Sequence, residues 1–189
     1  MDAQGRSPLH FEWNVQSAFS FLADEGFTIV EANPTLVRYR KGAVEVDVYH
    51  GRQSCEVGAG VTLSGVRYAI SEIVRASDPD IGKDYRNAIA TAPEEVAVSL
   101  KVLSALMQRY GEAAVRGDPK FFSILEAQRK RWSQDYALDV LASQLRPQAE
   151  EAFRRGDYLR AAELYGRIRE RLSPVEAKRL KLAEKRSRN

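Results

Sequence analysis

Residues 43–49 read Ala-Val-Glu-Val-Asp-Val-Tyr, an alternation of apolar and polar residues with a period of two. Because successive side chains of a strand point to opposite faces, this pattern predicts a β-strand with one buried face. The three valines fall on the core face, and their β-branched shape suits a strand. The wet face then carries the other large side chains of the stretch, Glu45, Asp47 and Tyr49.

Shorter segments of the same kind flank this strand and predict an antiparallel meander. Residues 27–31 and 36–40 precede it, and residues 55–61 follow it with the same alternation. Turns are predicted between these segments at Asn33-Pro34, at Lys41-Gly42 and over residues 50–53. The pattern therefore indicates three or four strands with one buried and one wet face, and it adds Glu56 to the wet face.

The remaining periodicity is helical. It predicts helices over residues 14–25, 66–76 and 93–110, with most of residues 77–92 as a loop. A further helix is predicted over residues 119–145, where Arg146-Pro147 ends it, because proline disfavours helical geometry in the residue before it. Two short helices over residues 148–155 and 158–172 follow, and the signal Ser173-Pro174-Val175-Glu176 has the spacing of a capping box for a last helix.

Together these elements predict an α+β protein in which a small antiparallel meander packs on helices and a helical C-terminal half follows. We place an α+β domain at residues 1–110 and a helical region at residues 111–189, packed together as one unit. At 189 residues, with 44% hydrophobic and 29% charged residues, the chain has the composition of a folded domain.

Composition also narrows the cellular setting. The sequence contains no apolar run of the roughly 18 residues that span a bilayer, and its first residues show no secretory signal. A single cysteine fits a reducing compartment, so we expect a cytoplasmic protein without a membrane partner. Net charge is −3 over residues 1–110 and +6 over residues 111–189, which makes the C-terminal part the basic one.

Catalytic and metal-binding residue patterns are scarce. His10, His50 and Cys55 are the whole inventory of histidine and cysteine, so no zinc-type cluster is expected. His50 and Cys55 form the one nucleophile–base candidate, but a small buried hydrophobe is the favoured interpretation of this cysteine. A metal site built from carboxylates alone, Glu45, Asp47 and Glu56, is the other open alternative. We therefore predict no enzyme activity, no cofactor and no metal.

Glycines in the predicted strand do not indicate a nucleotide site. Gly58-Ala59-Gly60 is too short for a phosphate-binding loop and does not lead from a strand into a helix. Glycine within a strand more often marks a bulge or a close approach of another group to the backbone.

One basic and aromatic cluster, Arg129-Lys130-Arg131-Trp132, suggests nucleic-acid binding as an alternative function. Four consecutive residues of a helix point in four directions, so they do not form one stacking surface. Trp132 shares an apolar stripe with Phe121, Leu125 and Tyr136, and core packing is therefore the favoured role of this tryptophan.

Residues 156–165, Gly-Asp-Tyr-Leu-Arg-Ala-Ala-Glu-Leu-Tyr, resemble the turn and second helix of a tetratricopeptide repeat. Ala161, Tyr165, Ile168 and Pro174 match the small, aromatic and closing positions of that family. The resemblance covers about thirty residues, and no second copy follows at a period near 34. Because stacked repeats form the peptide groove of that family, we interpret a single hairpin mainly as a structural brace, with partner docking as the alternative.

The layout as a whole is similar to small uncharacterised bacterial α+β proteins of the immunity-protein type, with residues 118–125 and 158–165 as the matching segments. That resemblance implies a protein that caps a partner. We thus expect a non-enzymatic protein-binding module, an immunity- or antitoxin-type inhibitor. Its predicted partner-binding residues are Glu45, Asp47, Tyr49 and Glu56, whose acidic face suits a basic partner, and the nucleic-acid alternative uses Arg129, Lys130 and Arg131.

Overall fold

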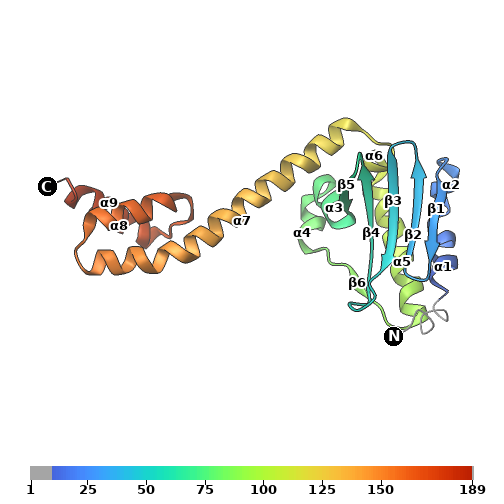
Figure 1. Ribbon diagram of the computed structural model, residues 1–189, viewed down its shortest axis with the longest axis horizontal. Helices are drawn as coiled ribbons and strands as arrows, with labels where there is room; N and C mark the ends of the chain where they lie inside the picture. The colour runs from blue at the N-terminus through green and yellow to red at the C-terminus, as the bar shows by residue number, and fades with distance from the viewer. Residues whose placement is uncertain (1–9, 189) are drawn as a thin grey trace. The chain divides into compact units, whose positions relative to one another are not determined.

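The computed structural model describes residues 10–188 and confirms the predicted α+β class. An antiparallel sheet in the N-terminal half is followed by a helical C-terminal half (Figure 1). The chain divides into two compact units, residues 1–127 and residues 128–189, which are called unit 1 and unit 2 below. None of the helices within residues 10–188 is both long enough and apolar enough to cross a membrane.

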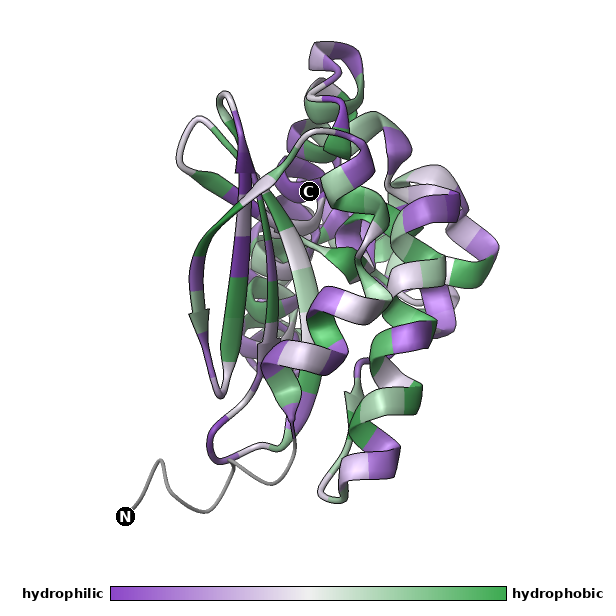
Figure 2. Cartoon of the chain, turned by 90° about the vertical axis from the view of Figure 1, so that its right-hand side faces the viewer, coloured by the Kyte–Doolittle hydropathy of each residue, from purple (hydrophilic) through white to green (hydrophobic). Residues whose placement is uncertain are grey.

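Unit 1 contains a single antiparallel sheet with the strand order β1-β2-β3-β4-β5, and the short β6 pairs with the start of β4. The sheet is larger than the three or four strands predicted. Its strands are β1 (Thr28–Asn33), β2 (Leu36–Lys41), β3 (Val44–His50), β4 (Glu56–Leu63), β5 (Val66–Ala69) and β6 (Ala88–Ile89). The strands carry alternating hydrophilic and hydrophobic residues, as Figure 2 shows. The valine face of β3 is buried as predicted.

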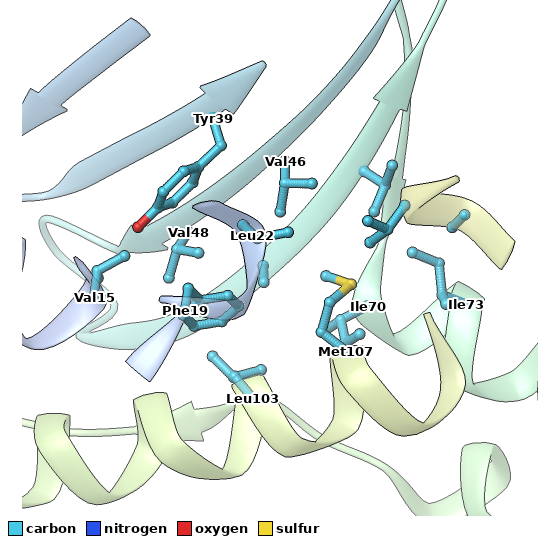
Figure 3. Close-up of a cluster of buried hydrophobic side chains, with 14 of the residues drawn as sticks. Val15, Phe19, Leu22, Tyr39, Val46, Val48, Ile70, Ile73, Leu103 and Met107 are labelled. Atoms are coloured by element: carbon cyan, nitrogen blue, oxygen red, sulfur yellow. The ribbon is translucent and has the colours of Figure 1, made fainter. Parts of the chain in front are cut away.

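The inner face of the sheet packs against helices. These are α1 (Phe11–Ala18), α2 (Phe21–Asp24), α3 (Ile70–Ser77) and α5 (Pro93–Tyr110). In Figure 3 side chains from α1 and α5 meet the valines of β3, with Val15, Val46 and Met107 all fully buried. Full burial of one such side chain contributes about 1.5–3 kcal/mol. The Ser104 hydroxyl of α5 also donates a hydrogen bond of 2.6 Å to the carbonyl of Ala18, at the end of α1.

Two predicted helices of unit 1 differ from the structure. The first begins at Phe11 and breaks after Ala18, so that Phe19 and Leu22 can both be fully buried. The second was predicted over residues 66–76, but its first four residues form β5 and only then does α3 begin. Ser64 and Gly65 both have positive φ, 51° and 82°, which is the backbone of a tight two-residue hairpin turn and returns the chain along β4. The predicted loop that follows contains α4 (Pro79–Asp84) and β6.

Residues 111–127 also belong to unit 1. They form α6 (Glu112–Val115) and the start of α7 (Pro119–Arg154). Ala114, Val115, Phe122 and Leu125 join the same hydrophobic core as the sheet. The structural division therefore falls after residue 127, whereas the predicted one fell after residue 110.

Unit 2 is a helical hairpin extended by one more helix. After α7 come α8 (Tyr158–Arg167), a 3-10 turn (Arg169–Arg171) and α9 (Pro174–Arg186). Their core combines small and large residues: Ala142, Leu145, Ala149, Ala152, Ala161, Leu164, Tyr165, Ile168, Leu180 and Ala183. The capping box predicted for α9 is present, since Glu176 N donates to Ser173 Oγ and Ser173 N donates to Glu176 Oε2.

The helix break predicted at Arg146-Pro147 is wrong. Pro147 lies inside α7, which continues to Arg154. Leu145 and Ala149, on either side of the proline, are both buried in the core of unit 2. Tertiary packing on both sides therefore holds the helical geometry against the local preference of proline.

Candidate functional site

The candidate site is the sheet face opposite the core of unit 1, called the open face below. The register pairs Asp47 with Gly60 and Tyr49 with Gly58, and it pairs Thr62 of β4 with Arg67 of β5. In Figure 1 this face lies in front, with α5 behind the strands. The structure thus brings the predicted residues Glu45, Asp47, Tyr49 and Glu56 to one face, as the alternation indicated.

An arginine and an aspartate form the centre of the open face. Arg67 binds Asp47 through two hydrogen bonds, Nε to Oδ1 at 2.8 Å and Nη2 to Oδ2 at 2.6 Å. This two-pronged geometry is the strong form of an ion pair. Asp47 has a side chain only 11% exposed, while that of Arg67 is 40% exposed. The arginine therefore covers the carboxylate and keeps its own outer edge in solvent.

Tyr49 and Glu56 form a second group of hydrogen bonds beside this pair. The Tyr49 hydroxyl donates to Glu56 Oε1 at 2.8 Å, and Asn87 Nδ2 donates to the same oxygen at 2.6 Å. Tyr85 donates in turn to Asn87 Oδ1 at 2.9 Å. The Arg67 guanidinium carbon lies 5.5 Å from the centre of the Tyr49 ring, within the range of a cation–π contact.

Two glycines let these side chains lie flat on the sheet. A Cβ atom at Gly58 would stand 2.5 Å from the Tyr49 ring, and one at Gly60 would stand 2.6 Å from the Arg67 guanidinium. Of the two sequence interpretations of these glycines, close approach to the backbone is therefore the correct one. We call Asp47, Tyr49, Glu56, Arg67 and Asn87, the side chains joined in this way, the Tyr–Arg cluster.

The pKa values of Tyr49 and Glu56 in this cluster are both shifted away from neutral pH. Burial, followed by the hydrogen bond to Glu56, raises the pKa of Tyr49 to about 12. Burial also raises the pKa of the neighbouring Tyr85 to about 12. The hydrogen bonds from Asn87 and then Tyr49 lower the pKa of Glu56 below its ordinary value. At pH 7 the phenols are thus neutral and the glutamate is ionised, which fixes the donors and acceptors of the cluster.

The open face is not the acidic surface that the sequence suggested. Glu45 is bound by Arg40 at 2.5 Å and approached by Arg38 at 3.8 Å. Arg38 also binds Glu31 at 3.1 Å. With Asp47 paired to Arg67, the carboxylates of the face lie beside arginines of comparable number. A basic partner is therefore not favoured by an excess of negative charge on this face.

Several residues of this face were not predicted from the sequence. Arg38 and Arg40 could have been found, because the alternation of β2 puts both on the same face as Glu45. Arg67 was missed because its segment was predicted to be helical, and the Ser64-Gly65 pair was the available signal for a hairpin there. Asn87 lies in a predicted loop, and no local pattern places it beside Glu56.

His50 and Cys55 hold one strand end in place. His50 is 2% exposed, and its Nε2 lies 2.8 Å from the carbonyl oxygen of Ala90. Cys55 was expected at an inward strand position, but it lies in the turn before β4 with a φ of 54° and is half-buried. Its carbonyl accepts a hydrogen bond of 2.9 Å from Ala90 N. Within residues 10–188 no group of three His, Cys, Asp or Glu side chains is placed to hold a metal ion.

In unit 2 the predicted basic cluster, Arg129, Lys130 and Arg131, is exposed. Trp132 is 54% exposed and Tyr136 is 73% exposed, so the predicted core role of this tryptophan is wrong. The tetratricopeptide-like residues Ala161, Tyr165 and Ile168 are buried in the hairpin core.

No protein-family model matches the chain, and comparison with curated proteins and with solved structures also finds no match.

Proposed function

We propose that the chain is a non-enzymatic protein-binding module that covers a partner with the open face of its sheet. The Tyr–Arg cluster is the observation that carries this proposal. Tyrosine and arginine are enriched among the residues that dominate binding energy at protein interfaces. Tyr49 and Arg67 are already held in place by Glu56 and Asp47, so little side-chain freedom remains to be lost on binding.

The balance of charges on the open face determines the chemistry of the partner. Because Glu45 and Asp47 are already paired with arginines, a partner that offers only basic residues would have to break those pairs. We propose instead a partner with both donors and acceptors, which meets the outer edges of Arg38 and Arg67. An immunity- or antitoxin-type inhibitor, in which the face covers a toxic protein, is the specific form of this function that we propose.

The state of the titrating groups supports a binding role over acid–base catalysis. A general acid or base works best with a pKa near the operating pH. In the Tyr–Arg cluster the pKa of Tyr49 is raised to about 12 and that of Glu56 is lowered, so both move away from neutrality. These shifts suit a rigid recognition surface that keeps one pattern of donors and acceptors.

The test is capture of binding partners with the folded full chain and with two double variants of it. The face variant, Arg38→Ala with Arg67→Ala, removes two cations of the open face. The helix variant, Lys101→Ala with Arg116→Ala, removes two exposed cations elsewhere in unit 1, one on α5 and one directly after α6. We expect a protein that the wild type and the helix variant retain and the face variant loses. If a monodisperse wild-type sample retains no specific protein, or if both variants behave alike, the proposal is wrong.

A captured partner also tests the inhibitor form. Expression of that partner alone should arrest growth, and co-expression of the wild-type chain should restore it, while the face variant should not. A partner that is harmless on its own would rule out the inhibitor form and leave protein binding in place.

The nucleic-acid alternative at Arg129, Lys130 and Arg131 stays a prediction. Successive helical residues point about 100° apart, so these three side chains do not share one face of α7.

A further inference from the structure

We infer that α9 of unit 2 binds the phosphate backbone of duplex DNA through a lysine stripe made of Lys178, Lys181 and Lys185. The stripe is remote in sequence from the basic cluster of α7 and belongs to a different unit from the open face. It therefore adds a second, independent binding function to the one proposed above.

The three lysines share one side of α9. They recur at spacings of three and four residues, which brings helical positions onto one face. All three are exposed, whereas the buried residues of the helix, Glu176, Leu180 and Ala183, fall on the opposite side. Arg188, just beyond the helix, lines a surface hollow together with Lys181 and Lys185, so it extends the stripe.

The charges of this stripe have no counter-charge within residues 10–188. Most carboxylates of unit 2 are bound by arginines, as in the pairs Arg146–Glu176 at 2.6 Å and Arg169–Glu184 at 2.7 Å. Glu184 lines the same hollow as the lysines, yet its charge is already taken by Arg169. Residues 128–189 contain sixteen Lys and Arg against nine Asp and Glu, a net charge of +7, and the stripe is a concentrated part of that excess.

Helix stability alone does not account for this arrangement. Like charges three or four residues apart destabilise a helix, and the stripe contains two such pairs within α9. The helix dipole favours cations only near the C-terminal end, which leaves Lys178, in the second turn from the N-terminus, without that benefit. A ligand with closely spaced negative charges would offset both effects.

The surroundings of the stripe favour duplex DNA over other polyanions. No aromatic residue occurs in α9, so the stripe has no platform on which single-stranded bases could stack. The buried side of α9 is used in the core of unit 2, and its exposed large apolar side chains, Val175 and Leu182, are too few to form a face that enters a membrane. The wide major groove of B-DNA admits the side of a helix, whereas that of duplex RNA is too narrow.

The spacing of charges predicts a measurable salt dependence. With a rise of about 1.5 Å per residue, residues 178 to 188 extend about 15 Å, a length over which duplex DNA carries about nine phosphates. If four cations each neutralise one phosphate, the logarithm of the binding constant falls with the logarithm of salt concentration with a slope of about −3.6. Between 50 and 200 mM salt the affinity should therefore fall about 10²-fold.

The experiment measures the anisotropy of a labelled random-sequence DNA duplex titrated with the full chain at several salt concentrations. Replacement of the stripe, Lys178→Gln with Lys181→Gln and Lys185→Gln, should reduce the magnitude of the slope by about 2.7. The matched control, Lys83→Gln with Lys101→Gln and Lys120→Gln, removes the same charge from exposed positions of unit 1 and should leave the slope unchanged. Circular dichroism checks that both variants are folded, and replacement of the stripe by arginines should preserve the slope.

Several outcomes would overturn the inference. One is an equal loss of affinity in the stripe variant and the control, which would make the effect one of net charge alone. Others are absence of binding at 50 mM salt, tighter binding of duplex RNA or single-stranded DNA than of duplex DNA, and binding of phosphatidylserine vesicles without binding of DNA.

Discussion

Replacement of Arg67 by alanine tests the physical account of the open face. The substitution leaves the Asp47 carboxylate, whose side chain is 11% exposed, without its cation and without two hydrogen bonds. Hydrogen bonds to charged groups contribute about 1.5–3 kcal/mol each, and an unpaired buried charge adds a penalty. Because the Arg67 side chain is 40% exposed, water replaces part of what is lost. We expect unit 1 to lose about 1–2 kcal/mol of unfolding free energy, or roughly 3–10 °C in melting temperature.

Urea unfolding followed by circular dichroism gives the change in free energy, and hydrogen exchange of the β3 and β4 amides assigns it to unit 1. Arg116→Ala is the matched control, because the Arg116–Glu112 pair is exposed on both sides, 64% and 62%. Such a pair contributes about 0.5 kcal/mol or less. Adding Asp47→Asn completes a double-mutant cycle, in which a coupling energy of about 1 kcal/mol is expected. The reasoning is refuted if Arg67→Ala is no more destabilising than Arg116→Ala, or if the coupling energy is below about 0.5 kcal/mol.

The remaining predictions concern single side chains. Asn87→Ala should raise the pKa of Glu56 toward its ordinary value, since the hydrogen bond from the Asn87 amide is the largest cause of its lowering. The pKa is measured from the carboxyl chemical shift of Glu56 as a function of pH. An identical pKa in the variant and the wild type would show that this cause is misassigned. In the wild type, Glu56 should contribute stability above its unfolded pKa and lose that contribution as pH falls through its lowered folded pKa. The buried hydroxyl of Tyr39 has no hydrogen-bond partner within residues 10–188, and burial raises its pKa to about 12. Tyr39→Phe should therefore add about 1 kcal/mol of stability and abolish the loss of stability that ionisation of Tyr39 causes between about pH 10 and 12. A variant whose melting temperature falls as much as that of the wild type over this pH range would contradict this prediction. Leu164→Ala should destabilise unit 2 by about 2–5 kcal/mol, whereas Leu159→Ala, at a position 63% exposed, should change little; equal exchange rates of the α8 amides in the two variants would count against the described core.

The sequence predicted the fold best where the hydrophobic periodicity agreed with the residues that begin and end each helix or strand. The valine alternation located β3 to within one residue at each end, and the proline and glutamates at the start of α5 located it over residues 93–110. Gly26, directly after the predicted helix of residues 14–25, has a left-handed φ of 87°, which is the conformation in which glycine commonly ends a helix. These features depend on residues close together in the chain, so a local pattern contains them.

Prediction failed where distant packing decided the structure. Pro147 is held inside a helix by burial on both sides of it, which no window around the proline can reveal. Trp132 has the spacing of a core residue, but a periodic stripe does not show whether a neighbour covers it.

In the candidate site, too, local pattern predicted some features and distant contacts decided others. Alternation placed Glu45, Asp47 and Tyr49 on one face, and that of β2 also puts Arg40 on the face of Glu45, but no local pattern showed that Arg67 pairs with Asp47. The Asp47–Arg67 pair depends on β5, which lies two strands away from β3. Charge counted along the sequence therefore overstated the acidity of the face.

The hydrogen bond from Ser104 to the carbonyl of Ala18 joins residues 86 positions apart, and this separation sets an order for folding. Strands β1 to β4 are consecutive hairpins whose contacts close over short loops, so they can pair early. Helices α1 and α2 precede the strands and can cover part of their valine face, but the cover is complete only when α5 exists. During synthesis the sheet therefore keeps part of its apolar face open until the ribosome has delivered α5, and this interval exposes the chain to aggregation.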